Sequence, residues 1–402
     1  MTVRITKPEF NLREKLSELD NPIGVHGSQL MRSESGAESF SLVRAGRKNM
    51  IINGAMSINQ RNGGSSFTIP HASGGSYGGP DRWAVNEATG GEVSVNMDGD
   101  PATANAHGVS VQEFSKAFQI ACSVADGNLG STANVHFFQN IEGHNITHLG
   151  WGTPTAKPVT LSFWIKTNKA GFYAVGLENS AVDRCCIRDY HQTGDSKWNK
   201  VILTFPGCTD GTWLTDNGIG IRVRFCLASG DNFDDGDDGE WVNSDELCTL
   251  KSKVVNFMDS TNNRFFITGV QLEEGTVATS FEHRSYEQEL SLCQRYYERH
   301  NWVSSQYVAL SGQHQSASAT SSRFVFPFLT RKRTTDPSFT ASGNYRGFPP
   351  SSGGEAVTLT GGEDNDTSVR VNVARITSFA GGTAILILSY GDGNYFEVED
   401  EL

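Results

Sequence analysis

The sequence has little charge and lacks long apolar runs. Lys, Arg, Asp and Glu make up 19% of its 402 residues, against about 25% in an average globular protein. No apolar run reaches the ~18 residues that a membrane-spanning helix needs. The first residues, Met1 to Lys7, lack the apolar core of a signal peptide. We therefore expect no transmembrane helix and a chain that starts out in the cytoplasm.

Basic charge and paired cysteine motifs are also missing. The formal net charge is −12, and an acidic balance argues against nucleic acid as a partner because phosphates need a cationic surface. The seven cysteines are an odd number and include the adjacent pair Cys185 and Cys186. They form no Cys-x-x-Cys motif, so we expect buried thiols rather than disulfides or a structural zinc site.

Glycine and aromatic residues are plentiful. The chain has 43 Gly, 23 Phe, 10 Tyr and 7 Trp. Enough aromatic residues are present to fill a core, which excludes a disordered chain, and the glycine excess indicates many turns. The composition and length predict a mostly β protein of two or three domains.

Residues 1–48 form the first predicted unit. Thr6 and Glu9 have the spacing of a helix capping box, and the following leucines recur at helical intervals. A helix is expected over 7–19, too short to be stable without a partner surface. We interpret the unit as an anchoring segment. Its anchoring residues are Pro8, Phe10, Leu12, Leu16 and Leu19.

Residues 49–284 contain short runs in which apolar and polar residues alternate, as in strands, and turn residues separate these runs. Leu161, Phe163 and Ile165 share one strand face and Trp164 points to the other. Strands do not alternate with long helical patterns, which excludes a parallel α/β sheet. The pattern predicts a β-sandwich whose core contains the large aromatic side chains. Three tryptophans are expected there: Trp83, Trp164 and Trp198.

A second helix is predicted over Ser285 to Arg299, within a linker assigned to 285–300. Apolar residues recur in it at spacings of 4, 3 and 4, a stripe that suits either a linker or a trimer contact. The stripe consists of Tyr286, Leu290, Cys293 and Tyr297. Residues 301–402 again alternate as strands and predict a second, C-terminal β-domain, with a loop over Gly347 to Gly354.

Several phrases resemble those of bacteriophage tail fibres that carry a carbohydrate-binding-module-like jelly roll. The phrase from Asn49 to Gln60, followed by Asp81-Arg-Trp83, resembles the start of that module. Phe265 to Gly275 resembles its last strand, and Leu290 to Tyr297 resembles the element that follows it in such fibres. The fold expected from the resemblance is a jelly-roll sandwich, a linker helix and a C-terminal β-domain behind a short N-terminal helical anchor.

The resemblance implies a structural protein of the virion, assembled in the host cytoplasm. It implies a non-enzymatic homotrimer that adheres to host surface polysaccharide and contacts other virion proteins through residues 1–48. The expected place is a tail fibre or receptor-binding appendage. One alternative is a capsid decoration or head-fibre protein held by its N-terminus. Another is a spike that degrades polysaccharide.

The densest acidic cluster runs from Asp231 to Glu240. Closely spaced carboxylates could bind calcium, which takes six to eight oxygen ligands, although the EF-hand spacing fails. The alternative is a solvated acidic loop, so the sequence requires no cofactor and calcium is only one interpretation. The candidate ligands are Asp231, Asp234, Asp235, Asp237 and Asp238.

Trp213 and Trp241 lie in turn-rich sequence, and Trp241 follows the acidic cluster. An exposed ring flanked by polar residues is suited to stacking on a sugar, which makes both candidate glycan-binding residues. Packing in the core or in an interface is the favoured interpretation, because most large aromatic residues pack.

Two short motifs have plain interpretations. Gly194-Asp-Ser196 occurs in the nucleophile block of some esterases, but here it falls in a turn between strands and predicts no catalytic residue. Arg331-Lys-Arg333 is basic within an acidic chain, and a solvated turn is favoured over contact with an acidic surface.

Overall fold

The computed structural model describes 48–72, 74–98, 113–233, 237–243, 255–302, 310–313, 321–348, 355–375, 384–389 and 393–402. The chain divides into two compact units. Within the small unit, the Lys48 main-chain N–H donates to Glu282 at 2.7 Å and its Nζ donates to Thr279 Oγ1 at 2.6 Å. The predicted N-terminal helix and its anchoring residues, Pro8, Phe10, Leu12, Leu16 and Leu19, lie outside the described residues.

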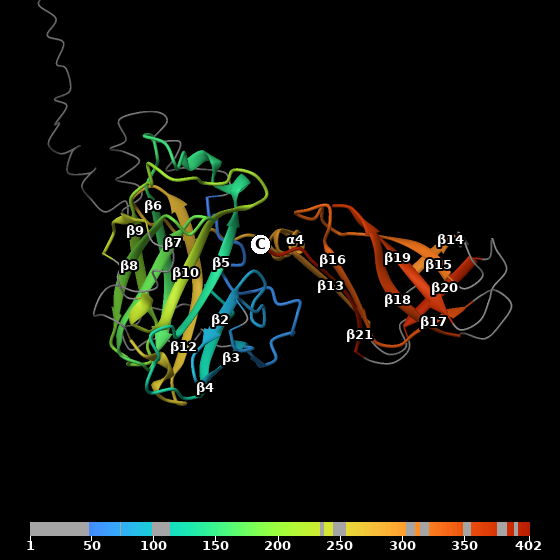
Figure 1. The fold of residues 1–402 in the computed structure, drawn as a ribbon, viewed down its shortest axis with the longest axis horizontal. Coiled ribbons are helices and arrows are strands. Elements are labelled where there is room, and N and C mark those ends of the chain that lie inside the picture. The colour runs from blue at the N-terminus through green and yellow to red at the C-terminus, as the bar shows by residue number, and fades with distance from the viewer. Residues whose placement is uncertain are drawn as a thin grey trace, which may run out of the picture. The chain divides into compact units, whose positions relative to one another are not determined.

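The predicted jelly-roll sandwich is confirmed as two six-stranded antiparallel sheets (Figure 1). The first sheet has the order β1 (Phe67–Thr68), β3 (Glu92–Asp98), β4 (Ala117–Val124), β12 (Arg264–Glu274), β6 (Val159–Thr167) and β9 (Asn199–Phe205). The second has the order β11 (Trp241–Val242), β8 (Cys185–Gln192), β7 (Gly171–Glu178), β10 (Ile219–Ser229), β5 (Asn134–Glu142) and β2 (Ala84–Ala88).

Alternating residues of both sheets fill the sandwich core. Phe163 of β6 and Phe137 of β5 both pack on Phe225 of β10, and the Phe137 and Phe225 rings stack at 4.6 Å. Trp83 adds an edge contact to Phe225 at 6.0 Å. Trp83, Trp164 and Trp198 are all buried. Of the three, Trp83 lies in the sandwich core as predicted, whereas Trp164 and Trp198 lie outside it, Trp164 on the strand face opposite Phe163.

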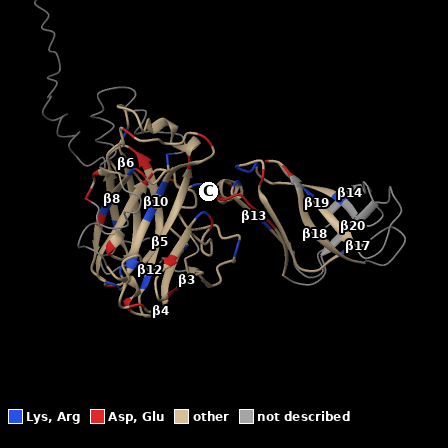
Figure 2. Ribbon diagram, in the orientation of Figure 1, with Lys and Arg blue, Asp and Glu red and all other residues tan. Residues whose placement is uncertain are grey.

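Polar residues occupy the other face of β10. Arg222 and Arg224 alternate with the core residues of that strand, and both donate to Glu178 of β7, at 2.8 and 2.6 Å. Figure 2 shows basic positions along β10 in blue. Glu178 is 1% exposed, so its charge is compensated by the two guanidinium groups rather than by water.

The described connections of the sandwich contain the short 3₁₀ helices η1 (Gly143–Asn145), η2 (Thr147–Leu149), η3 (Asp231–Phe233) and η4 (Phe257–Asp259). The six cysteines of the described residues are all buried.

The predicted second helix is shorter than its sequence pattern suggested. Helix α4 covers Tyr286–Gln294 and begins with a capping box between Ser285 and Gln288. The prediction to Arg299 is wrong because strand β13 starts at Tyr297, which pairs with Glu399. Adjacent aromatic residues favour a strand, and Tyr296 and Tyr297 are both buried.

The C-terminal β-domain contains two more antiparallel sheets. The smaller has the order β13 (Tyr297–Trp302), β21 (Asn394–Glu399) and β16 (Ser338–Ser342). The larger has the order β14 (Leu310–Gln313), β20 (Ala384–Ser389), β17 (Tyr345–Phe348), β18 (Glu355–Asp364), β19 (Ser368–Arg375) and β15 (Ser321–Pro327). The predicted loop at Gly347 is wrong at its start, since Gly347 and Phe348 belong to β17.

One apolar core joins the two C-terminal sheets. Phe396 of β21 stacks on Tyr345 of β17 at 5.2 Å and contacts Phe326 of β15 at 5.8 Å. A separate small core lies under α4, where Cys293 and Tyr296 pack on Ile52 and Ile58. The helix therefore packs on the start of the sandwich within its own chain.

Candidate functional site

A cavity of about 530 Å³ lies where the turn after residue 58 meets helix α4 and strand β13. Its volume falls in the range of about 300–1,000 Å³ typical of ligand pockets. Most of its side chains are neutral amides, with two arginines and one tyrosine beside them. The lining consists of Asn59, Gln60, Arg61, Asn62, Gly63, Tyr286, Leu290, Gln294, Arg299 and Asn301.

The segment before the turn is fixed to the sandwich by close backbone contact. The N–H of Val270 donates to the Gly54 carbonyl at 2.9 Å. A Cβ atom at Gly54 would lie 2.1 Å from the Val270 carbonyl oxygen, so only glycine fits this approach. Asn49 adds a hydrogen bond from its Nδ2 to the same oxygen at 3.1 Å.

Two buried polar side chains then shape the turn. Asn53 has a left-handed backbone (φ 57°), and its Oδ1 accepts from the N–H groups of Ser57 and Ile58 at 2.9 and 3.0 Å. Asp81 accepts from the main chain of Gln60 at 3.0 Å and from its Nε2 at 2.6 Å. Burial raises the pKa of Asp81 above its usual value, although Arg61 and Gln60 oppose this.

The turn is also tied directly to strand β13. Gln60 Nε2 donates to the Tyr297 carbonyl at 2.9 Å, and Arg299 Nη1 donates to the Arg61 carbonyl at 2.6 Å. Arg299 and Asn301 are two residues apart on β13 and so lie on one face of the strand. Arg299 Nε donates to Asn301 Oδ1 at 2.8 Å, which fixes the two pocket side chains against each other.

Helix α4 supplies the apolar part of the lining. Tyr286, its first residue, is 59% exposed, while Leu290 one turn later is half-buried against the small core under the helix. The exposed ring of Tyr286 can stack on an apolar ligand face, and its hydroxyl can form a hydrogen bond.

The two pocket arginines are already stacked on tyrosines. The Arg61 guanidinium lies 3.6 Å from the centre of the Tyr297 ring and 4.8 Å from that of Tyr77. The Arg299 guanidinium lies 3.7 Å from the Tyr395 ring centre. Planar stacking of this kind holds an arginine in one orientation.

Carboxylates of the C-terminal segment pair with the same arginines. Arg61 Nη2 lies 3.1 Å from Glu399 and 3.4 Å from Glu401, and Arg299 lies 4.0 Å from Glu397. Burial, together with the hydrogen bond to Glu397, raises the pKa of Tyr297 well above its usual value. The phenol therefore stays neutral at physiological pH.

Two donors of the lining lack a hydrogen-bond partner among the described residues. They are Asn59 Nδ2 and Arg61 Nη1, and both atoms are buried. The Arg61 side chain is 8% exposed. A buried donor without a partner costs about 1–3 kcal/mol, so a ligand that supplied acceptors would recover this free energy.

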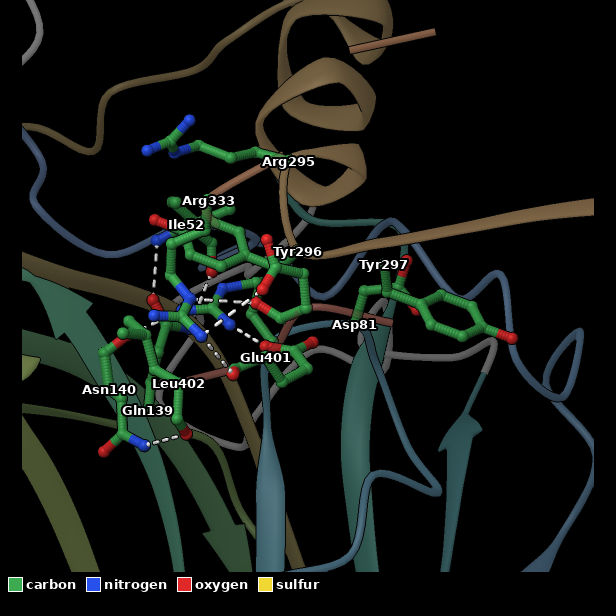
Figure 3. Close-up of polar contacts among 12 residues, drawn as sticks. Ile52, Asp81, Gln139, Asn140, Arg295, Tyr296, Tyr297, Arg333, Glu401 and Leu402 are labelled. Atoms are coloured by element: carbon green, nitrogen blue, oxygen red, sulfur yellow. Dashed lines mark hydrogen bonds and ion pairs between the residues drawn. The ribbon is translucent and has the colours of Figure 1, made fainter. Parts of the chain in front are cut away.

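The C-terminal segment lies against the sandwich beside this site (Figure 3). Glu401 pairs with Arg82, and Asn140 Nδ2 donates to the main-chain oxygen of Leu402 at 2.7 Å. Arg333 Nη2 donates to the Glu401 carbonyl at 3.1 Å. These contacts fix the segment whose carboxylates pair with the pocket arginines.

The predicted basic turn at Arg331 to Arg333 is wrong for its middle and last residues. The side chain of Lys332 is fully buried and lies 2.8 Å from that of Glu298, and Arg333 Nη2 donates to Asp400 at 3.3 Å. Only Arg331 is exposed, pairing with Asp366 at the surface. The cluster therefore holds its own chain together.

The predicted glycan-binding tryptophans do come together, but in a packed cluster. Trp213 and Trp241 contact each other edge to face at 5.4 Å, and both contact Trp151, at 4.6 and 5.2 Å. Trp213 is 7% exposed, which leaves its ring little room to stack on a sugar. Trp241 remains half-buried, with its Nε1 donating to the Pro206 carbonyl at 2.9 Å.

The structure describes only part of the predicted calcium loop. Asp234 and Asp235 lie outside the described residues, whereas Asp231, Asp237 and Asp238 are exposed. Asp238 pairs with Arg188 at 3.2 Å. Across the described residues, no three His, Cys, Asp or Glu side chains gather as metal ligands.

The predicted trimer stripe is divided between two environments. Tyr286 and Leu290 line the pocket, whereas Cys293 and Tyr297 are 0% and 1% exposed within the chain. Cys293 and Tyr297 are therefore not available to another subunit. The helical spacing cannot apply to Tyr297, which lies in β13.

Most pocket residues were missed by the sequence prediction. The resemblance marked the phrase from Asn49 to Gln60 as a landmark of the fold, without a role for its amides. Arg299 and Asn301 lay where a helix and a domain boundary were expected. Of the pocket residues, the sequence prediction selected only Tyr286 and Leu290, as part of the apolar stripe of a linker or trimer helix.

Fold and pocket define a β-protein with a jelly-roll sandwich, a second β-domain and a polar ligand-sized pocket. No helix within the described ranges is long and apolar enough to span a bilayer. No family model and no curated protein matches the chain.

Solved structures similar to the chain include two carbohydrate-binding modules and one phage domain. A CBM4 module is 15% identical over 56% of this chain and 98% of its own, with a TM-score of 0.28. The family 11 module of the Clostridium thermocellum cellulase Lic26A-Cel5E is 11% identical over 54% and 99%, with a TM-score of 0.26. The enzymatically active domain of tailspike protein 4 from bacteriophage CBA120 is 13% identical over 56% and 21%, with a TM-score of 0.28. All three TM-scores lie below 0.5.

Proposed function

We propose that this chain is a non-enzymatic adhesion protein that binds glycans in the pocket between the turn at 59–63 and helix α4. The observation that carries the proposal is the lining, in which planar amides and arginines surround one exposed tyrosine ring. A sugar ring presents hydroxyl groups around its edge and C–H groups on its faces. Amides and guanidinium groups match the hydroxyls, and Tyr286 matches a face.

The composition of the lining favours binding over hydrolysis at this pocket. Glycoside hydrolysis generally uses a pair of carboxylates beside the bond that breaks. None of the ten described residues that line the pocket is Asp or Glu. The carboxylates nearby are occupied in ion pairs with Arg61, Arg82 and Arg299.

We extend the proposal to a phage virion, on the basis of the sequence resemblance. Residues 1–48 would attach the protein to the particle, and several copies, arranged as trimers, would multiply weak glycan contacts into firm adhesion. A tail position is favoured over the capsid. Cross-linking from Lys7 and Lys15 in purified particles would distinguish the two, because a capsid fibre would couple to the major capsid protein.

The binding site is tested by replacing the exposed ring. We expect Tyr286→Ala to weaken binding to host surface polysaccharide by about fivefold or more, the loss typical of an aromatic contact worth ~1 kcal/mol. Phe172→Ala is the matched control, since Phe172 is 39% exposed and lies outside the pocket lining. Equal binding by both variants and the wild-type protein would contradict the assignment of the pocket.

A further inference from the structure

We infer that the pocket selects neutral, hydroxyl-rich saccharides and rejects acidic ones; this deepens the proposed function and rests on it. Two arginines in a pocket would ordinarily suggest an anionic ligand, because guanidinium groups bind carboxylates and phosphates well. The partners of these two arginines point to the opposite selectivity.

The charge of Arg61 is already compensated. Its Nη2 is shared between Glu399 and Glu401, and its guanidinium contacts the Tyr297 and Tyr77 rings. A ligand carboxylate would have to displace one of these glutamates or lie beside them. Either arrangement costs free energy that a ligand hydroxyl avoids, since like charges in close contact repel.

Arg299 is similarly occupied. Its Nε and Nη1 donate to Asn301 and to the Arg61 carbonyl, at 2.8 and 2.6 Å, and Glu397 lies 4.0 Å away. Glu397 also accepts from the Tyr297 hydroxyl at 2.8 Å. The second arginine is therefore a structural support of the pocket wall rather than a free positive charge.

The surroundings as a whole carry no positive excess. Three arginines, Arg61, Arg82 and Arg299, are matched by three carboxylates, Glu397, Glu399 and Glu401. The donors that remain without a partner are Asn59 Nδ2, which is neutral, and Arg61 Nη1, on the compensated guanidinium. Both suit a hydroxyl oxygen, which accepts a hydrogen bond without bringing charge.

The experiment compares neutral oligosaccharides of glucose, galactose and N-acetylhexosamine with the corresponding uronate oligosaccharides. Titration calorimetry on the full chain at low and high salt measures both affinities. We expect the neutral sugars to bind with an affinity that salt changes less than about twofold, since no net charge is paired on binding. Uronates are expected to bind at least about fivefold more weakly.

A charge variant makes the test sharper. Glu399→Gln removes one partner of Arg61, and we expect uronate affinity to rise about two- to fivefold, the effect of a partly exposed ion pair. Glu240→Gln makes the same charge change at an exposed residue outside the pocket and should leave uronate affinity unchanged.

Tight, salt-sensitive uronate binding by the wild-type protein would overturn the inference while leaving glycan binding intact. Failure of Glu399→Gln to raise uronate affinity above the Glu240→Gln value would overturn it too. Binding of no saccharide in either class would overturn the proposed function itself, and the inference with it.

Discussion

Single residues with buried charge hold the C-terminal β-domain together near the pocket. Glu298 accepts from Lys332 Nζ at 2.8 Å, from His300 at 2.5 Å and from the Leu329 main chain at 3.1 Å. Taking two charges out of water costs several kcal/mol per ion. The buried pair of Glu298 and Lys332 is stable because Glu298 accepts all of these hydrogen bonds. The sequence could not reveal it, since Lys332 lies 34 residues from its partner inside a basic triplet typical of a surface turn.

Lys332→Met is expected to lower the free energy of unfolding by about 3–5 kcal/mol, because it leaves the Glu298 charge buried and unpaired. The neighbouring Arg331→Met is the control. Arg331 is 73% exposed and pairs with Asp366 at the surface, so its loss should stay within about 1 kcal/mol. Chemical denaturation of both variants measures the difference, and similar losses would show that Lys332 is not held as described.

At the scale of elements, the join between sandwich and C-terminal domain departs most from the sequence prediction. The strands of the sandwich were predictable because alternation and turn residues are local signals. The end of α4 was not, because Tyr297 continues the helical spacing of Tyr286, Leu290 and Cys293. Pairing with β21, about a hundred residues later in the chain, decides its conformation. The pocket depends on that pairing, which explains why its residues were missed.

The capping box of α4 positions the tyrosine of the pocket. Ser285 Oγ accepts from the Gln288 N–H at 3.3 Å, so Ser285→Ala should cost about 1 kcal/mol of stability and weaken glycan binding by loosening Tyr286. Ser285→Asp keeps an acceptor at the cap and should retain both properties. Thermal unfolding and glycan titration of the two variants check this, and full binding by Ser285→Ala would argue against the role of the cap.

For the whole molecule, acid stability follows from the buried carboxylates. Burial alone would raise the pKa of Glu298, but His300 and Lys332 hold it below its usual value; Arg295 and Tyr296 do the same for Glu142. A carboxyl group whose pKa is lowered by folding stabilises the folded state when the pH is above its unfolded-state pKa, about 4.3 for Glu. This stabilisation is lost as the pH falls through the folded-state pKa. Asp81 acts in the opposite sense, because its raised pKa favours the folded state in acid.

The melting temperature should therefore change little between about pH 7 and pH 5 and fall below about pH 4.3. Glu298→Gln should be less stable at neutral pH and should show a shallower fall in acid, since one of the titrating groups is gone. Melting curves across this range test the prediction. A wild-type melting temperature that holds or rises down to about pH 3 would contradict it.

A glycan bound in the pocket between the 59–63 turn and α4 can be observed directly. The most direct measurement is a crystal structure of the full chain soaked with a neutral oligosaccharide fragment of host surface polysaccharide. We expect sugar density in the pocket, with one ring against Tyr286 and hydroxyl groups within hydrogen-bond distance of Asn59 and Arg61. An empty pocket with the sugar bound elsewhere, such as beside Trp241, would contradict it.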